Sequence, residues 1–184
     1  GERAVANTLV IPSVPRRVDS HQVVYAPREL RWLGECIKSN VDPDTTDDER
    51  LLVTRCGAST RRIANDNELI DVLRPLGFDS VNLTELSFEK QVELFAGASA
   101  VIAPHGAGLI NMIYSEDIQI LEIFGDFVTP LYYCIAAGLG FPYRYERSKT
   151  TQPTVASPGV SAPGDDLVVD VERLETIVRE WIVE

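Results

Sequence analysis

The sequence predicts an α/β fold with a Rossmann-like, open and mostly parallel sheet and helices on both faces. Three observations lead to this prediction. Short apolar segments without alternation, such as 51–54 and 100–103, are typical of strands that are covered on both faces. Segments with helical spacing lie between them, so strand and helix alternate along the chain. The 184 residues, of which 45% are hydrophobic, suit one core, and we expect a single domain over 1–184.

The first elements form a lead-in region, expected over residues 1–49. Residues 9–11 predict a short strand, and residues 27–39 have apolar side chains at helical spacing with Pro27 near the start. An acidic, turn-rich stretch follows over 41–49. The chain opens Gly-Glu-Arg without an initiator Met or a signal-peptide pattern, so we expect it to be a fragment of a longer protein.

The central repeat is expected over residues 50–145. Ser87 can cap a helix, and Pro75 with Gly77 can end one. In an open α/β sheet, ligands bind beyond the carboxyl ends of the strands. The predicted strands are 51–54, 78–83, 100–103, 119–124 and 142–145, and the predicted helices are 66–73, 87–96, 109–114 and 129–137.

Two further segments complete the expected domain. Residues 150–166 are rich in Pro, Gly, Ser and Thr and predict an exposed loop. Residues 167–184 predict a closing strand and then an amphipathic helix. Residues 94–114 are almost entirely apolar, but Pro104, His105 and three glycines interrupt the run, so we expect buried core rather than a membrane span.

The chain is acidic, with a formal net charge of −11 and a pI near 4.6. Its long-range field repels phosphate backbones and anionic lipid, which argues against nucleic acid as a partner. Any bound phosphate must therefore be held by local donors, namely backbone amides at a helix start and a few arginines. Only three of the 17 basic residues are lysines, which fits a halophilic source; an acidic, arginine-preferring bacterial protein is the alternative.

The three cysteines, Cys36, Cys56 and Cys134, are an odd number, which does not suit a disulfide framework. They also lack the paired spacing of a zinc site. They favour a reducing, cytoplasmic environment, and no metal site is predicted. We expect association with the inner face of the cell membrane only through regions outside this chain.

The first candidate site is the turn after the strand at 100–103. The segment Val101-Ile-Ala-Pro-His-Gly-Ala-Gly-Leu-Ile-Asn111 runs from a strand through a glycine-rich turn into a helix. Small residues let backbone amides approach a phosphate, and the unpaired amides of a first helical turn point toward it. Gly106, Ala107, Gly108 and Leu109 are the candidates. Alternatively, the glycines merely let the helix pack on the strand.

Three polar residues near this turn are further candidates. His105 stands at its mouth, where a ring nitrogen can contact a phosphate and offset charge on a departing diphosphate, or can bond a backbone carbonyl instead. Asn111 either contacts substrate or stabilises the turn. Glu122 is a carboxylate in an apolar strand and therefore needs a partner, either ribose hydroxyls or an arginine from a neighbouring element.

Basic residues follow the first central strand. Arg55, Arg61 and Arg62 come at its carboxyl end, with Asn65 shortly after, so we expect them on the same rim as His105. Guanidinium forks match phosphate oxygens, although solvated loop arginines are the alternative.

Several short motifs together resemble glycosyltransferase family 61. They occur in the order and with gaps similar to those of that family, over about residues 50–145. The motifs are Thr54-Arg55, Arg61-Arg62-Ile63, Asn65-Asp-Asn-Glu68, Leu86-Ser-Phe-Glu-Lys-Gln91, Ala103-Pro-His-Gly-Ala-Gly-Leu-Ile-Asn111 and Leu121-Glu-Ile123.

The resemblance implies one half of a GT-B glycosyltransferase, namely its carboxyl-terminal, donor-binding domain. It implies an inverting transfer from a nucleotide sugar to a glycan or protein acceptor, as in capsular polysaccharide or glycoprotein synthesis, and no required metal or cofactor. It makes Arg55 and Arg61 or Arg62 phosphate contacts, residues 105–109 the diphosphate turn, and Glu122 the ribose contact. No catalytic base is visible, so we expect this chain alone to be inactive.

Two other functions remain open from the sequence. Gly106 and Gly108 supply two glycines of a dinucleotide fingerprint, which would suit an oxidoreductase, but Asn111 stands where the third is needed. A non-catalytic module that binds a sugar nucleotide is the second. A serine hydrolase is disfavoured because the chain has no Gly-x-Ser-x-Gly turn.

Overall fold

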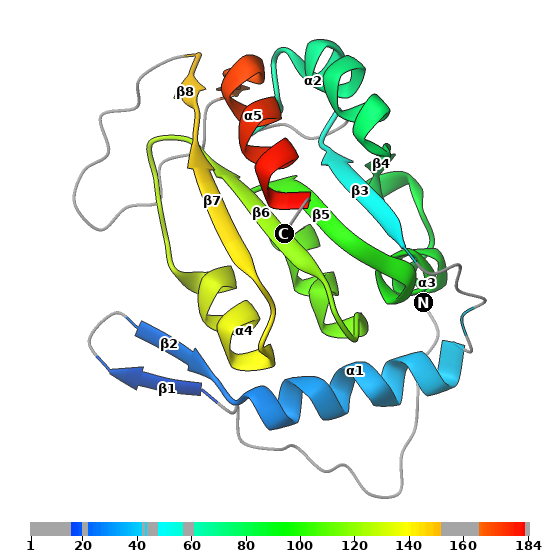
Figure 1. The fold of residues 1–184 in the computed structure, drawn as a ribbon. Coiled ribbons are helices and arrows are strands. Elements are labelled where there is room, and N and C mark those ends of the chain that lie inside the picture. Colours follow the sequence, from blue (N-terminus) through cyan, green and yellow to red (C-terminus); the bar gives the residue numbers. More distant parts are fainter. Residues whose placement is uncertain are drawn as a thin grey trace, which may run out of the picture.

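The computed structural model describes residues 16–19, 22–41, 43, 48–56, 61–151 and 166–182 (Figure 1). The strand predicted at 9–11 and most of the loop predicted at 150–166 lie outside these residues.

The centre of the fold is a five-stranded parallel sheet in the order β4-β3-β5-β6-β7. Its strands are β3 (Glu49–Thr54), β4 (Phe78–Asn82), β5 (Ala98–Pro104), β6 (Gln119–Phe124) and β7 (Tyr143–Arg147). The predicted α/β, Rossmann-like sheet with helices on both faces is confirmed. The chain runs outward from β3 to β4 and then crosses to β5 on the other side. The carboxyl ends of β3 and β5 therefore form the point where the winding reverses, which is where such sheets bind ligands.

One face of the sheet is covered by α2 (Asp66–Leu73) and α5 (Val171–Ile182), and Figure 1 shows α5 in front of the strands. Both helices are amphipathic, as predicted. The inward sides of α2 (Leu69, Leu73) and α5 (Val178, Trp181) are almost completely buried against strand residues such as Leu52. Burial of such side chains stabilises a fold by about 1.5–3 kcal/mol each, so these two helices anchor this side of the sheet.

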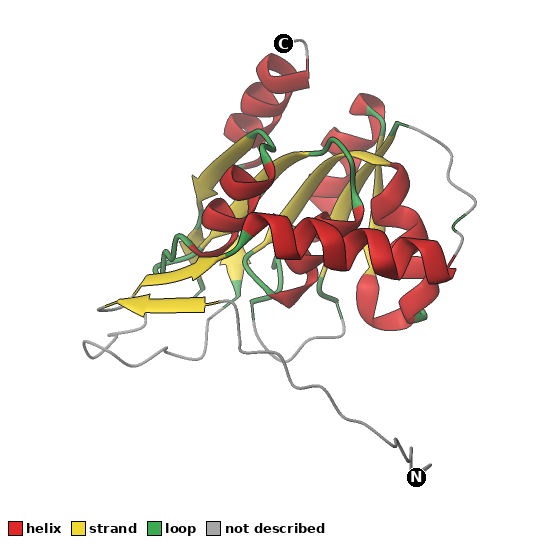
Figure 2. Cartoon of the chain, turned by 90° about the horizontal axis from the view of Figure 1, so that it is seen from below, coloured by secondary structure: helices red, strands yellow, loops and turns green. Residues whose placement is uncertain are grey.

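The opposite face is covered by α3 (Phe88–Gly97), a 3₁₀ helix η3 (Ala107–Tyr114) and α4 (Leu131–Leu139), with α1 (Pro27–Val41) packed against all three. The predicted cap of α3 is present, since the Ser87 hydroxyl accepts a hydrogen bond from the Lys90 amide at 3.2 Å. Gly34 lets α1 approach η3 closely, because a Cβ there would lie 2.0 Å from the Ile113 carbonyl oxygen. Figure 2 shows α1 crossing this side of the molecule.

Some local elements differ from the sequence prediction. The segment predicted as a helix at 109–114 is the 3₁₀ helix η3, and it begins at Ala107, immediately after the turn. A hairpin of β1 (Arg16–Asp19) and β2 (Gln22–Tyr25) was not expected, nor was the pairing of β8 (Lys149–Thr150) with β9 (Leu167–Val168). Such short ladders depend on partners that local patterns do not specify. Two further short 3₁₀ turns, η1 (Arg74–Leu76) and η2 (Leu83–Glu85), flank β4.

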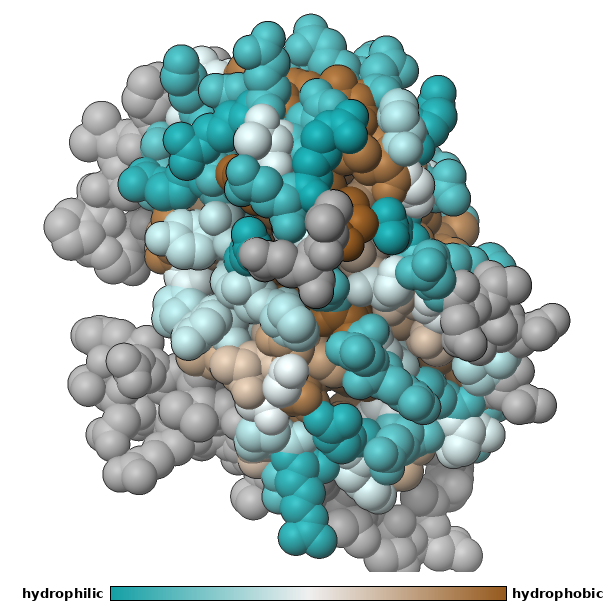
Figure 3. Space-filling model, viewed as in Figure 1, coloured by the Kyte–Doolittle hydropathy of each residue, from teal (hydrophilic) through white to brown (hydrophobic). Residues whose placement is uncertain are grey.

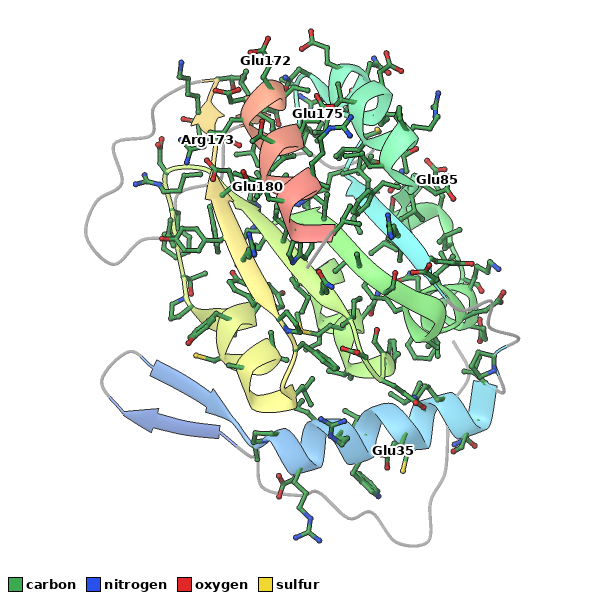
Figure 4. The ribbon with its side chains drawn as sticks, in the orientation of Figure 1. Glu35, Glu85, Glu172, Arg173, Glu175 and Glu180 are labelled. Carbon is green, nitrogen blue, oxygen red and sulfur yellow. The ribbon has the colours of Figure 1, made fainter. Side chains whose placement is uncertain are left out.

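The surface seen in Figure 3 is mainly hydrophilic over α2 and α5, with hydrophobic residues visible between them. Figure 4 shows Glu172, Glu175 and Glu180 on α5, and Glu35 on α1, on the outside of the domain. The acidic charge therefore includes the outer sides of helices. Among the helices of the described residues, none is both long enough and apolar enough to span a membrane.

Candidate functional site

A cavity of about 380 Å³ lies at the point where the winding of the sheet reverses. Residues 53–55 at the end of β3 form one side of it, and residues 82–84 after β4 form another. Residues 103–104 and 106–111, from β5 through η3, complete the wall. The cavity therefore opens where the topology of an open α/β sheet predicts a ligand.

Arg55 lies in this cavity against the glycine turn. A Cβ on Gly106 would stand 2.6 Å from an Arg55 guanidinium nitrogen, so the absence of a side chain at 106 is what lets the guanidinium approach the backbone. Burial, and then the neighbouring positive charge of Arg61, lower the pKa of Arg55. A partly desolvated cation beside a second cation is a position that an anion stabilises.

Arg61 lies over the same turn. Its guanidinium donates a hydrogen bond to the His105 carbonyl oxygen at 3.0 Å. Its backbone has φ 58°, in the left-handed region that non-glycine residues rarely adopt. Such backbone strain is concentrated at binding sites. Arg55 and Arg61, six positions apart in sequence, are therefore both held at the turn that follows β5.

The turn itself is tied to the sheet and open on its amide side. The His105 amide donates to the Ile123 carbonyl at 2.9 Å, and the Leu109 amide donates to the Gly106 carbonyl at 3.1 Å. The amides of Ala107 and Gly108 belong to the first turn of η3, where the helix offers no earlier carbonyl for them to bond. Ala107 and Gly108 line the cavity, and binding of a phosphate by their amides stays a prediction.

Asn111 forms the inner part of the cavity and is fixed by a second amide. Gln91 on α3 donates from Nε2 to the carbonyl oxygens of Leu83 (3.0 Å) and Leu86 (3.4 Å). Its Oε1 must therefore be the acceptor for Asn111 Nδ2, at 3.0 Å. Asn111 is buried and thus stabilises the turn, as one sequence interpretation held, while its carboxamide also lines the cavity.

His105 and Glu122 form a separate cluster on the β6 side of the turn. The Glu122 side chain is 0% exposed. One of its oxygens lies 2.5 Å from His105 Nδ1, and the other accepts a hydrogen bond from the Tyr143 hydroxyl at 2.5 Å. Neither residue lines the cavity that contains Arg55. The partners of Glu122 are thus a histidine and a tyrosine rather than an arginine, and a ribose contact stays a prediction that requires one of these bonds to break.

The ring of His105 is enclosed by aromatic side chains. It stacks on Phe124 with 5.2 Å between ring centroids, and Tyr132 and Phe127 lie at 5.5 and 6.4 Å. The side chain is nevertheless 15% exposed, and among the described residues no hydrogen-bond partner is found for its Nε2. One ring nitrogen of His105 is therefore held by a buried carboxylate, and the partly exposed ring keeps Nε2 without a hydrogen-bond partner among the described residues.

Tyr143 differs strongly from a surface tyrosine. Burial and then the bond to the Glu122 carboxylate raise the pKa of Tyr143 far above its ordinary value of 10.0. The phenol therefore remains protonated and acts only as a donor to Glu122 at any physiological pH.

Arg62 and Asn65 turn toward the other face of the sheet. Arg62 forms a forked ion pair with Asp166, with its Nε and a terminal nitrogen 3.0 and 2.6 Å from the same carboxylate oxygen. The Asn65 carboxamide exchanges two hydrogen bonds with the backbone of Val169, at 2.9 and 3.0 Å. Their observed contacts join the segment before α2 to the segment before α5.

The sequence analysis missed Tyr143 and Gln91 as members of the site region. Tyr143 was part of an expected strand, and its polar end becomes significant only because β7 lies beside β6 in register, with Glu122 opposite Tyr145. Gln91 belonged to a recognised motif but had no assigned role.

No metal site adjoins these residues. Within the described parts of the chain, no group of three or more His, Cys, Asp or Glu side chains is arranged to hold an ion. The independence from metal that the resemblance implies stays a prediction.

Comparison with known families favours one of the functions left open by the sequence. A family model described as Glycosyltransferase 61 matches residues 5–119, which is more than half of the chain. The chain belongs to the glycosyltransferase 61 family. No curated protein matches it.

Membership of glycosyltransferase 61 indicates glycosyltransferase activity, and with it binding of a nucleotide sugar and an acceptor. The matched segment starts earlier and ends earlier than the span of resemblance expected from the motifs. It contains Arg55, Arg61 and the whole turn through Asn111, whereas Glu122 and Tyr143 lie beyond it.

Proposed function

We propose that this chain binds the diphosphate of a nucleotide-sugar donor in the cavity between β3 and β5. The observation that supports the proposal is the position of Arg55, which lies against Gly106 in the wall of that cavity and close to a second guanidinium, that of Arg61. Arg55 and residues 107 and 108 line one small space, with Arg61 bonded to the adjoining His105 carbonyl, although the chain as a whole is acidic.

The proposed reaction is an inverting transfer to a glycan or protein acceptor, in capsular polysaccharide or glycoprotein synthesis. The acceptor hydroxyl gives up its proton to a general base as its oxygen attacks the anomeric carbon, and the bond from that carbon to the diphosphate breaks with its electron pair passing to the leaving oxygen. Arg55 and the turn amides stabilise the resulting charge, which is the largest contribution a protein makes to such a step. No cofactor is required for this chemistry, and a cytoplasmic location suits a nucleotide-sugar donor.

Binding of nucleoside diphosphates tests the proposal directly. Calorimetric titration of the full-length protein with UDP, GDP, CDP and dTDP should give saturable binding of at least one of them. Arg55→Ala should then weaken that binding at least tenfold, about 1.4 kcal/mol, because the main phosphate contact is lost.

Arg74→Ala is the matched control, since it removes the same charge from an exposed position at the amino end of β4. Its affinity should equal that of the wild type. The absence of binding in the wild type, or equal binding by Arg55→Ala, would contradict the proposal. NADH belongs in the same titration, and saturable NADH binding would favour a dinucleotide-binding oxidoreductase instead.

A further inference from the structure

A fully buried carboxylate with two hydrogen-bonded partners is the most unusual feature of the site region. Glu122 lies on β6 between Ile120–Leu121 and Ile123–Phe124, all of them buried, and its own side chain is 0% exposed. A buried charge is costly unless it is paired and hydrogen-bonded, so its surroundings must supply both.

Only two polar side chains supply those bonds among the described residues. Tyr143 provides a neutral hydroxyl, and His105 provides ring Nδ1, each 2.5 Å from a different oxygen of Glu122. Of these two, only the imidazole can become a cation at physiological pH. The Glu122 carboxylate is therefore neutralised locally when His105 carries a second proton.

His105 does not line the cavity, but its chain neighbour Gly106 does, so a bound diphosphate must extend from the cavity to reach the ring. The ring faces Phe124, Phe127 and Tyr132, while the His105 carbonyl accepts from Arg61 and Gly106 contacts Arg55. The two arginines place positive charge at this turn, and a bound diphosphate brings negative charge to it.

We propose that Glu122 and Tyr143 are positioning residues that hold His105 as an imidazolium when a nucleoside diphosphate is bound, with Nε2–H donating a hydrogen bond to the diphosphate. The inference rests on the proposed function, and it gives Glu122 a role other than contact with ribose. Tyr143 donates to the Glu122 carboxylate and fixes its orientation, and the carboxylate accepts from Nδ1–H of His105. Nε2 of His105 is then left for the ligand. This is the arrangement by which a buried carboxylate orients a histidine in many active sites.

Histidine nitrogen NMR provides a readout that a merely structural role would not change. The two histidines of this chain are His21 and His105, and the His105→Gln variant assigns the His105 signals by their absence. Long-range proton–nitrogen spectra of the full-length protein are recorded without ligand and with saturating UDP, or with whichever of GDP, CDP and dTDP binds. On addition of ligand, both ring nitrogens of His105 should move to the shift of a protonated ring. In Glu122→Gln they should not.

Affinity measurements provide the second arm. Glu122→Gln keeps the size of the side chain and should weaken nucleoside diphosphate binding about tenfold, and Tyr143→Phe should weaken it about threefold. The affinity for the corresponding nucleoside monophosphate should fall less in both variants, because we place the His105 contact on the terminal phosphate of the diphosphate. Tyr114→Phe is the matched control, since it removes a hydroxyl from another buried tyrosine of the same core and should leave affinity unchanged.

The outcomes separate the two proposals. Binding to the wild type without protonation of His105, or with wild-type affinity in Glu122→Gln, would overturn the positioning role while the donor cavity stands. Failure of every nucleoside diphosphate to bind the wild type would overturn both. If Glu122→Gln does not fold, the wild-type spectrum and Tyr143→Phe decide the matter, because the phenylalanine variant loses only one oxygen.

Discussion

Two polar regions lie near the carboxyl edge of the sheet, and they use similar residues differently. The cavity region contains Arg55 and the turn at 104–109, whose groups surround an open space. The clamp region, which we define as Arg62 and Asn65 with their partners Asp166 and Val169, has its polar groups bonded to other parts of the chain. Groups that line the cavity lie where a ligand can contact them, whereas the polar groups of the clamp region are bonded to one another and join two segments of the fold.

The comparison predicts opposite consequences of mutation. Changes at Arg55 or Gly106 should alter ligand binding with little effect on stability, because neither residue belongs to the hydrophobic core clusters. Changes in the clamp region should alter stability with little effect on binding. Three variants test this separation, in order of decreasing effect.

Gly106→Val should have the largest effect. A Cβ at this position would lie 2.6 Å from the Arg55 guanidinium, so the arginine must leave the turn and the branched side chain must enter the cavity wall. We expect nucleoside diphosphate affinity to fall at least a hundredfold, about 2.7 kcal/mol, in calorimetric titration. The urea midpoint should change little, because the end of an arginine side chain can move. A variant that binds as the wild type does would show that the ligand lies elsewhere.

Asn65→Ala should have an intermediate effect, on stability. The substitution removes both hydrogen bonds to the Val169 backbone and leaves that amide and carbonyl without their partner. The free energy of unfolding should fall by about 1–3 kcal/mol in urea denaturation. Asn67→Ala, at an exposed position of α2, is the control and should cost much less. Loss of ligand affinity in Asn65→Ala without loss of stability would contradict the proposed division.

Asp166→Asn should have the smallest effect, and one that depends on pH. The hydrogen bonds and charge of Arg62 lower the pKa of Asp166 below its ordinary value of 3.8. A carboxyl whose pKa is lower in the folded state stabilises the fold fully above its unfolded pKa, and that contribution is lost as pH falls through the folded value. Wild type should therefore exceed Asp166→Asn in stability at neutral pH, and the difference should shrink well below pH 3.8.

Urea unfolding of both proteins across this pH range measures the difference. The pair is largely exposed, with the Arg62 side chain 51% accessible, so the effect should be small and should weaken further with salt. Asp79→Asn, an exposed carboxyl on β4, is the control. A difference that persists unchanged at low pH would show that the ion pair is not its cause.

Much of the fold could be predicted because the relevant signals are local. The apolar segments at 51–54 and 119–124 are strands, the stripe at 66–73 is a helix, and Ser87 caps α3. The strand order could not be read from any segment, since it depends on which strands pair across long separations. The 3₁₀ form of η3 was missed because an apolar run of eight residues does not distinguish it from an α-helix.

The sequence by itself determined the alternation of strands and helices, the glycine turn, and the supply of arginines near it, because these depend on residue type and spacing. Only the tertiary structure showed that Arg55 lines the cavity whereas Arg62 pairs with Asp166. It also showed that His105 and Tyr143 are the partners of Glu122. Both outcomes depend on which residues become neighbours in the folded chain. Residues such as Arg62 and Asp166, 104 positions apart, become neighbours only when the chain folds. The sequence therefore shows which charged groups are present but not which of them pair with one another.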